Sequence, residues 1–240
     1  MIDYFLHIPK TGGTSFAKMI DGHYSKNEIL PYQIWPDLVE AWPLNVKDYK
    51  LVRGHFGHGL HHIFGRNNMR YLTMLRDPVD RMISQFNHIT IDYKFNNWNF
   101  NFPYSSLEEM IQKRPHVLAN IQTRYLAADN ELSNSTYNQS KVQMYPVWGD
   151  SNLLFNPEKI FEKACRNLDQ FYFVGFLEQY QKSYDRLCEL MKWESEKVVH
   201  LNKTSEILQT EVFPKKIIDQ IRIINKWDYK LYDYAIKRWG

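Results

Sequence analysis

A buried strand that runs directly into a glycine turn and a helix opens the chain, and this feature constrains the fold most. Residues 2–8 are apolar and aromatic and stop at a proline, which is typical of a buried strand. The turn spans residues 10–15, and Phe16, Met19 and Ile20 follow it at helical spacing. The chain therefore begins as strand, glycine loop and helix.

Strands and helices alternate along the rest of the chain. Further strands are expected at residues 50–56, 70–75 and 171–175, with a short one at 198–201. Helices are expected after residue 77, over 105–127 with a break near Pro115, over 177–191 and over 214–239. Loops are expected at 31–50, 92–104 and 129–152. This alternation predicts a single α/β domain over residues 1–240, with a central, mostly parallel sheet flanked by helices.

Composition narrows the class of protein. With 44% hydrophobic and 24% charged residues the chain is globular, and its net charge of +3 is too diffuse to indicate nucleic-acid binding. No apolar stretch is long enough to span a bilayer, and the first ten residues lack a signal peptide, so a cytoplasmic protein is expected. Cys165 and Cys188 form no CxxC pair, so two free thiols are expected, with a disulfide as the alternative. The sequence also leaves open whether the protein forms an oligomer.

The glycine loop has the composition of an anion-binding site. Gly12 and Gly13 let the backbone turn tightly and present several N–H groups to one point. The following helix adds a partial positive charge there, and Thr14 and Ser15 add hydroxyl donors. Lys10 precedes both glycines, whereas a Walker A lysine follows the last glycine, so ordinary ATP or GTP hydrolysis is disfavoured. The alternative is a plain glycine turn between strand and helix.

A second candidate anion site lies at a helix start. Arg76 ends an expected strand, Asp77 is a good N-cap, and Pro78 is a good first helical residue. An arginine in this place can bind a phosphate through two N–H bonds, and Ser84 lies two turns further on. The alternative is that Arg76 only pairs with Asp77 or with Asp80.

Three of these segments, in this order, resemble a known family. Residues 7–15 resemble the 5′-phosphosulfate loop of carbohydrate sulfotransferases related to the heparan sulfate 2-O- and 6-O-sulfotransferases. Residues 75–81 with Ser84 resemble their 3′-phosphate segment, and residues 53–56 resemble the Gly-His segment that carries their catalytic base. Weaker resemblance is seen at residues 120–126, 173–178 and 201–204.

The resemblance implies a P-loop-like three-layer fold and a sulfuryl donor, 3′-phosphoadenosine 5′-phosphosulfate (PAPS), with no metal. It also implies which residues bind that cofactor: Lys10, Thr11, Gly12, Gly13, Thr14, Ser15, Arg76, Ser84, Asn202, Lys203 and Thr204. The acceptor it implies is a hydroxyl of a glycan or glycolipid. A loop with Trp98, Phe100 and Phe102 either stacks on that sugar or packs into a core.

Sulfuryl transfer needs a base for the attacking hydroxyl and a cation for the leaving nucleotide. We expect His55 to be the base, with His58 as second choice, and Lys10 to be the cation. Four histidines within residues 55–62 suggest a metal site as an alternative, but their spacing matches no usual metal-binding motif. A surface cluster is therefore expected for His58, His61 and His62. A kinase on the same fold and a non-catalytic nucleotide-binding protein are the rival functions.

Overall fold

The structure is a computed structural model, and it describes residues 1–64, 69–95, 104, 106–113, 115, 118–128, 156–198 and 213–240. The predicted loop at 129–152 lies outside the described residues. So does most of the predicted strand at 198–201, of which Val198 is described and is not in a strand. Within the described ranges, no helix has the length and apolarity needed to cross a membrane.

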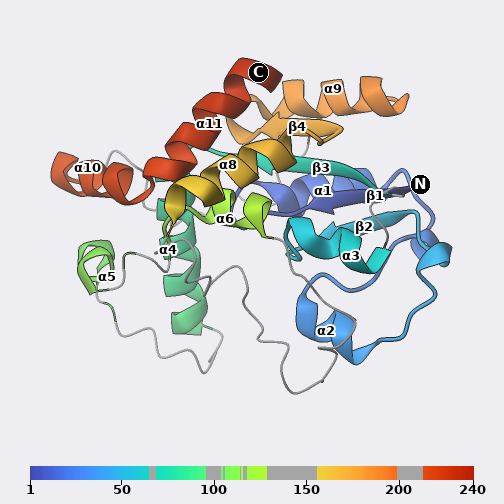
Figure 1. Cartoon of the computed structure of the whole chain (residues 1–240), viewed down its shortest axis with the longest axis horizontal. Coiled ribbons are helices and arrows are strands. Elements are labelled where there is room, and N and C mark those ends of the chain that lie inside the picture. The colour runs from blue at the N-terminus through green and yellow to red at the C-terminus, as the bar shows by residue number, and fades with distance from the viewer. Residues whose placement is uncertain are drawn as a thin grey trace.

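Among the described residues, the core of the fold is a parallel sheet of four strands in the order β2-β1-β3-β4 (Figure 1). The strands are β1 Ile2–Leu6, β2 Leu51–Gly54, β3 Met69–Leu75 and β4 Phe173–Phe176. Leu6 pairs with Gly54 on one side and with Thr73 on the other. Because all strands are parallel, their carboxyl ends emerge at one edge, as the predicted α/β class requires. The strand order reverses between β1 and β3, which is where such sheets place their ligands.

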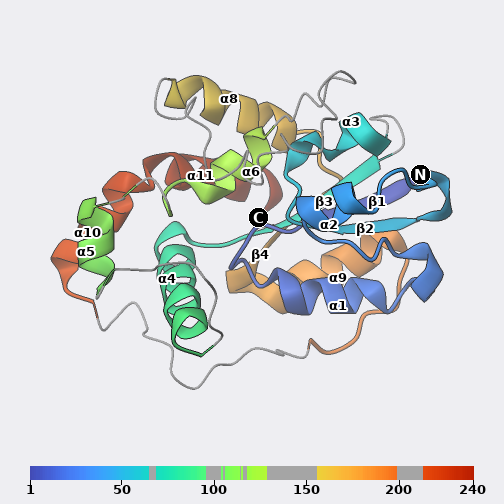
Figure 2. The same cartoon turned by 90° about the horizontal axis from the view of Figure 1, so that it is seen from below.

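Helices cover both faces of the sheet, so the predicted three-layer arrangement is confirmed (Figure 2). Alternate side chains of β1 divide between the faces: Phe5 faces one core, and Tyr4 and Leu6 face the other. The helices α1 Gly13–Asp21 and α9 Tyr180–Met191 pack on the first face. The opposite face is covered by α3 His61–Phe64, α6 Ile121–Ala127, α8 Pro157–Leu168 and α11 Lys226–Trp239.

Three further helices form a third apolar cluster beyond the carboxyl edge. It joins α4 Pro78–Phe95, α5 Leu107–Lys113 and α10 Lys215–Ile224. The expected helix over 105–127 is broken as predicted, and α4 runs four residues into the expected loop at 92–104, as far as Phe95. Short 3₁₀ helices lie at Lys26–Glu28, Val46–Asp48, His58–Leu60 and Leu177–Gln179.

The expectation that residues 31–50 form only a loop is wrong. Residues 31–50 contain α2, Trp35–Glu40, which begins at a proline-containing turn and buries Trp35 and Leu38. The prediction that residues 214–239 are helical is confirmed, and the chain turns at Asn225 between α10 and α11. The side chain of Asn225 accepts a hydrogen bond from the backbone N–H of Asn120, a partner that is distant in sequence. Both cysteines are free thiols.

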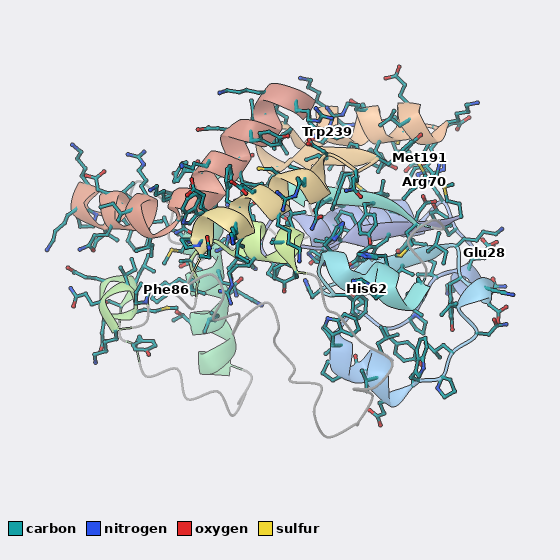
Figure 3. The ribbon with its side chains drawn as sticks, viewed as in Figure 1. Glu28, His62, Arg70, Phe86, Met191 and Trp239 are labelled. Carbon is teal, nitrogen blue, oxygen red and sulfur yellow. The ribbon has the colours of Figure 1, made fainter. Side chains whose placement is uncertain are left out.

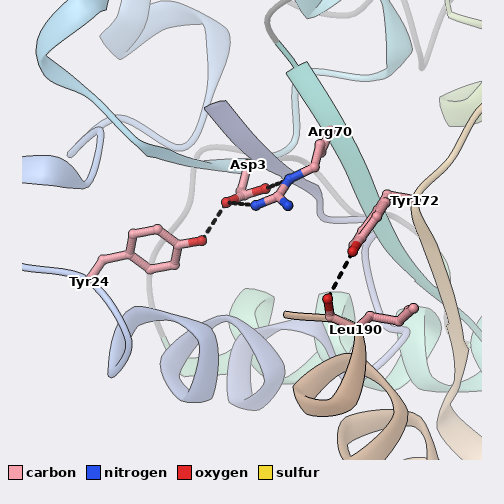
Figure 4. Close-up of polar contacts among 5 residues, drawn as sticks. All are labelled: Asp3, Tyr24, Arg70, Tyr172 and Leu190. Atoms are coloured by element: carbon pink, nitrogen blue, oxygen red, sulfur yellow. Dashed lines mark hydrogen bonds and ion pairs between the residues drawn. The ribbon is translucent and has the colours of Figure 1, made fainter. Parts of the chain in front are cut away.

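A polar network ties the elements together at the amino-terminal edge of the sheet (Figure 4). Arg70 donates two hydrogen bonds to the Asp3 carboxylate, at 2.6 and 2.9 Å, and the Tyr24 hydroxyl donates a third at 2.6 Å. The Arg70 guanidinium also lies 5.0 Å from the centre of the Tyr172 ring, whose hydroxyl donates to the Leu190 carbonyl at 2.9 Å. Figure 3 shows Arg70 at this end of the molecule, far from Phe86 on α4.

Candidate functional site

The carboxyl edge of the sheet gathers the segments that the sequence analysis singled out. Residues 7–12 follow β1, His55 follows β2, Arg76 follows β3 and residues 177–178 follow β4. The parallel register brings these ends level, so Lys10, His55 and Arg76 share one edge. The amino-terminal network described above lies at the opposite edge and does not belong to the site.

The glycine loop is shaped by its own backbone. Lys10 and Gly12 both adopt the left-handed conformation, with φ of 68° and 80°. Between them Thr11 is fully buried, and its hydroxyl donates to the Ile8 carbonyl at 2.9 Å, so this side chain closes the turn. The N-cap of α1 is Gly12, which has no side chain to cap the helix, and the first turn of α1 holds no acidic residue. The N–H groups and dipole of α1 therefore favour an anion at this point.

Close packing explains why both glycines are needed. A Cβ atom on Gly13 would lie 2.1 Å from Cδ2 of His7, and one on Gly12 would lie 2.5 Å from Cδ1 of Leu177. The Tyr180 hydroxyl of α9 donates to the Gly12 carbonyl at 3.1 Å and holds the loop from the other side. Next along the chain, Thr14 is exposed and Ser15 is buried, so Thr14 is the more accessible of the two to a ligand in solution.

His55 is held in a defined tautomer. Its Nδ1 lies 2.6 Å from the carbonyl oxygen of His7. A carbonyl oxygen can only accept, so Nδ1 carries the proton and Nε2 presents its lone pair. The backbone N–H of His55 donates to the Gln33 carbonyl at 2.7 Å, which fixes the residue at a second point. Burial lowers the pKa of His55 below its ordinary value, so the imidazole is a neutral base.

His7 is a site residue that the sequence analysis missed. Its ring is 8% exposed and lies 4.3 Å from the ring of His55, centroid to centroid. Burial lowers its pKa well below the ordinary value, and the nearby ionisable groups of His55, Lys10 and Arg53 lower it further. His7 is therefore neutral, and Lys10 and Arg53 supply the positive charge near it, which favours an anionic ligand. Its position at the end of β1, directly before the loop, was the available signal.

Arg76 links the two candidate anion sites. Its Nη1 donates to the Lys10 carbonyl at 3.2 Å, and it makes no ion pair within the described part of the chain. An ion pair with Asp77 therefore does not hold the Arg76 side chain in place. The Asp77 Oδ1 instead accepts from the N–H groups of Val79 and Asp80, at 2.8 and 3.1 Å, which confirms it as the N-cap of α4. Ser84 lies two turns along α4 and is half-buried.

The expected surface cluster of histidines is wrong for two of its three members. His58 and His61 are 2% and 3% exposed, and only His62 is exposed. The His58 ring stacks on Tyr71 at 4.9 Å, and Nδ1 of His61 lies 2.8 Å from the Tyr71 hydroxyl. These rings pack in the core, because β3 supplies an aromatic partner that sequence spacing cannot reveal. Among the described residues, no group of three His, Cys, Asp or Glu side chains is placed to hold a metal ion.

Asn202, Lys203 and Thr204, expected in the cofactor loop, lie outside the described residues. The same holds for the aromatic side chains expected near the acceptor, at positions 98, 100 and 102.

A family model described as "Sulfotransferase family" matches residues 4–235 of the chain. Among solved structures, the crystal structure of a sulfotransferase from Alicyclobacillus acidocaldarius is similar to it, with 13% sequence identity and a TM-score of 0.46. That similarity covers 94% of this chain and 96% of the other. No curated protein matches the chain in sequence.

Proposed function

Because this chain belongs to the sulfotransferase family, we propose that it transfers a sulfuryl group from PAPS to a hydroxyl of a carbohydrate acceptor, a glycan or glycolipid. The observation that carries the proposal is the hydrogen bond from Nδ1 of His55 to the His7 carbonyl. It leaves the basic Nε2 available at the sheet edge where the anion-binding loop also lies.

The residues at this edge fit a donor with phosphate groups at both ends of its ribose. The first turn of α1, free of acidic residues, would bind the 5′-phosphosulfate through residues 12–15. Arg76 and Ser84 would bind the 3′-phosphate from the end of β3 and from α4. We assign the rest of the cofactor contacts to residues 202–204, as the resemblance implies.

Each catalytic residue then has one task. Nε2 of His55 takes the proton of the attacking hydroxyl, which makes the acceptor oxygen nucleophilic as it meets sulfur. The Lys10 ammonium stabilises the negative charge that develops on the bridging oxygen of the leaving nucleotide. Sulfuryl transfer is an in-line displacement, so orientation of donor and acceptor supplies much of the rate.

The test is a transfer assay with radiolabelled PAPS against a panel of glycans, glycolipids and small hydroxyl compounds. We expect His55→Ala and Lys10→Ala each to lower turnover by at least about 100-fold. The affinity of His55→Ala for 3′,5′-ADP should stay near that of the wild type. His62→Ala is the matched control, because His62 is an exposed histidine of the same segment, and it should transfer normally.

Three outcomes would contradict the proposal. Wild-type turnover in His55→Ala would remove this imidazole from the reaction. In a thermal-shift experiment, stabilisation by ATP and not by 3′,5′-ADP would favour a kinase on the same fold. Binding of 3′,5′-ADP without transfer to any member of the panel would favour a non-catalytic nucleotide-binding protein.

A further inference from the structure

The backbone of Arg76 is held by one buried side chain from another element. Oε1 of Gln122 accepts from the Arg76 N–H at 2.9 Å, and its Nε2 donates to the Arg76 carbonyl, also at 2.9 Å. Gln122 is 1% exposed, so water does not compete for these bonds. One amide group therefore satisfies both polar groups of this residue's backbone.

The position of Arg76 explains why such a clamp is needed. β3 ends at Leu75, so the next residue has left the sheet and has no strand partner. A buried backbone group without a hydrogen-bond partner lowers the stability of the fold, so partners must come from other elements. The next N–H along, that of Asp77, donates to Oε1 of Glu178 at 2.8 Å. The turn is thus fixed from α6 and from the end of β4.

Gln122 is itself fixed by a reciprocal cap between α6 and α11. The Asp228 carboxylate accepts from the N–H groups of Gln122 and Thr123, at 3.1 and 2.8 Å, in the first turn of α6. In return, Oδ1 of Asn120 accepts from the N–H groups of Trp227 and Asp228, at 3.0 and 3.1 Å. Neither helix is capped by its own N-cap side chain. Each helix start is therefore completed by the other helix.

We propose that Gln122 is a positioning residue for recognition of the donor's 3′-phosphate, an inference that rests on the proposed function. Its amide fixes the Arg76 backbone, while the Lys10 carbonyl holds the tip of the same side chain through Nη1. Held at both ends, the guanidinium is aimed before the nucleotide arrives. Without the hydrogen bonds from Gln122, Arg76 keeps its positive charge, but its guanidinium is no longer held in one orientation.

The test compares two nucleotides that differ only in the 3′-phosphate. Dissociation constants of 3′,5′-ADP and of 5′-AMP are measured by calorimetry for the wild type, Gln122→Met and Arg76→Ala. Methionine keeps the length of the side chain and makes neither hydrogen bond. We expect Gln122→Met to lower the preference for 3′,5′-ADP by about tenfold, and Arg76→Ala to lower it further. The affinity for 5′-AMP should hardly change in either variant.

A matched control separates positioning from loss of stability. Nδ2 of Asn167 donates to the Leu126 carbonyl at 2.8 Å, at the other end of α6. Asn167→Ala should lower the melting temperature of the protein without changing the nucleotide preference. A merely structural role for Gln122 would instead make Gln122→Met behave like this control.

The conservative variant Gln122→Glu adds a pH-dependent readout, and it serves if Gln122→Met does not fold. An ionised carboxylate cannot donate to the Arg76 carbonyl, whereas a protonated carboxyl group can, and burial raises its pKa. Relative to the wild type at each pH, the preference for 3′,5′-ADP should recover as the pH falls. An unchanged preference in both variants would overturn the inference alone. A wild type that does not prefer 3′,5′-ADP would overturn the proposed donor as well.

Discussion

Asn120→Ala removes one half of the reciprocal cap between α6 and α11, and its cost can be worked out from the contacts. The Asn120 side chain accepts from the N–H groups of Trp227 and Asp228 and donates to the Ile224 carbonyl at 2.8 Å. Asn120 also has a left-handed backbone, with φ of 53°. Asparagine tolerates this conformation better than alanine does. The variant therefore loses a cap, leaves a carbonyl unpaired and strains the backbone.

Each of these losses has a typical magnitude. A lost N-cap costs about 1 kcal/mol, the unpaired carbonyl about 1 kcal/mol, and left-handed alanine about 1 kcal/mol. Together they predict a loss of about 3 kcal/mol in the free energy of unfolding, or about 6–12 °C in melting temperature for a chain of this length. Urea denaturation with linear extrapolation measures the first quantity, and the slope shows whether the unfolded state has changed.

Asn120→Gly is the matched variant, because glycine adopts the left-handed conformation without strain. It should lose about 2 kcal/mol, which is the hydrogen-bond part alone. The difference between the two variants then measures the backbone strain. An Asn120→Ala protein within about 0.5 kcal/mol of the wild type would refute the reasoning, since surface substitutions cost no more than that.

Two further predictions concern the site and the opposite edge of the sheet. Burial lowers the pKa of His55 below 6.5, so its base form persists to lower pH. The rate of transfer should therefore rise with pH only below 6.5 and be flat above it. A rate that rises with pH around a midpoint above neutral pH would contradict this. Arg70→Met leaves the buried Asp3 carboxylate with the Tyr24 hydroxyl as its remaining described partner. Since Arg70 is partly exposed, the loss should be about 2 kcal/mol by urea denaturation, with normal turnover per folded molecule.

Much of the fold could be predicted from local patterns. A strand that is buried on both faces must be apolar throughout, so the segments that became β1, β3 and β4 were visible as short apolar runs. Helix α4 was marked by its own first residues, with Asp77 as cap. The patterns failed where a distant partner decides the structure. The turn at Asn225 and the burial of His58 depend on Asn120 and Tyr71, and spacing along the chain cannot show these contacts.

The candidate site also contains residues that local patterns predict and residues that only distant contacts reveal. Lys10, His55 and Arg76 were found because their residue types follow strand ends, and the structure brings them to one edge; their roles stay predictions. No comparable signal pointed to Gln122, whose contact with Arg76 joins residues that are 46 positions apart in the chain. It was visible only as one letter in a segment of weak family resemblance.

The geometry of the Arg76 turn explains why the last helix of the chain bears on the site. A residue that has just left a parallel sheet has no ladder partners, and each buried group left unpaired costs about 1–3 kcal/mol. The fold pairs these groups through Gln122, whose own N–H is held by Asp228 of α11. The Tyr232 hydroxyl, one turn further along α11, holds Glu178 at 2.6 Å, the partner of the Asp77 N–H. One face of α11 therefore supports both side chains that fix the turn, so this helix does more than cover the sheet.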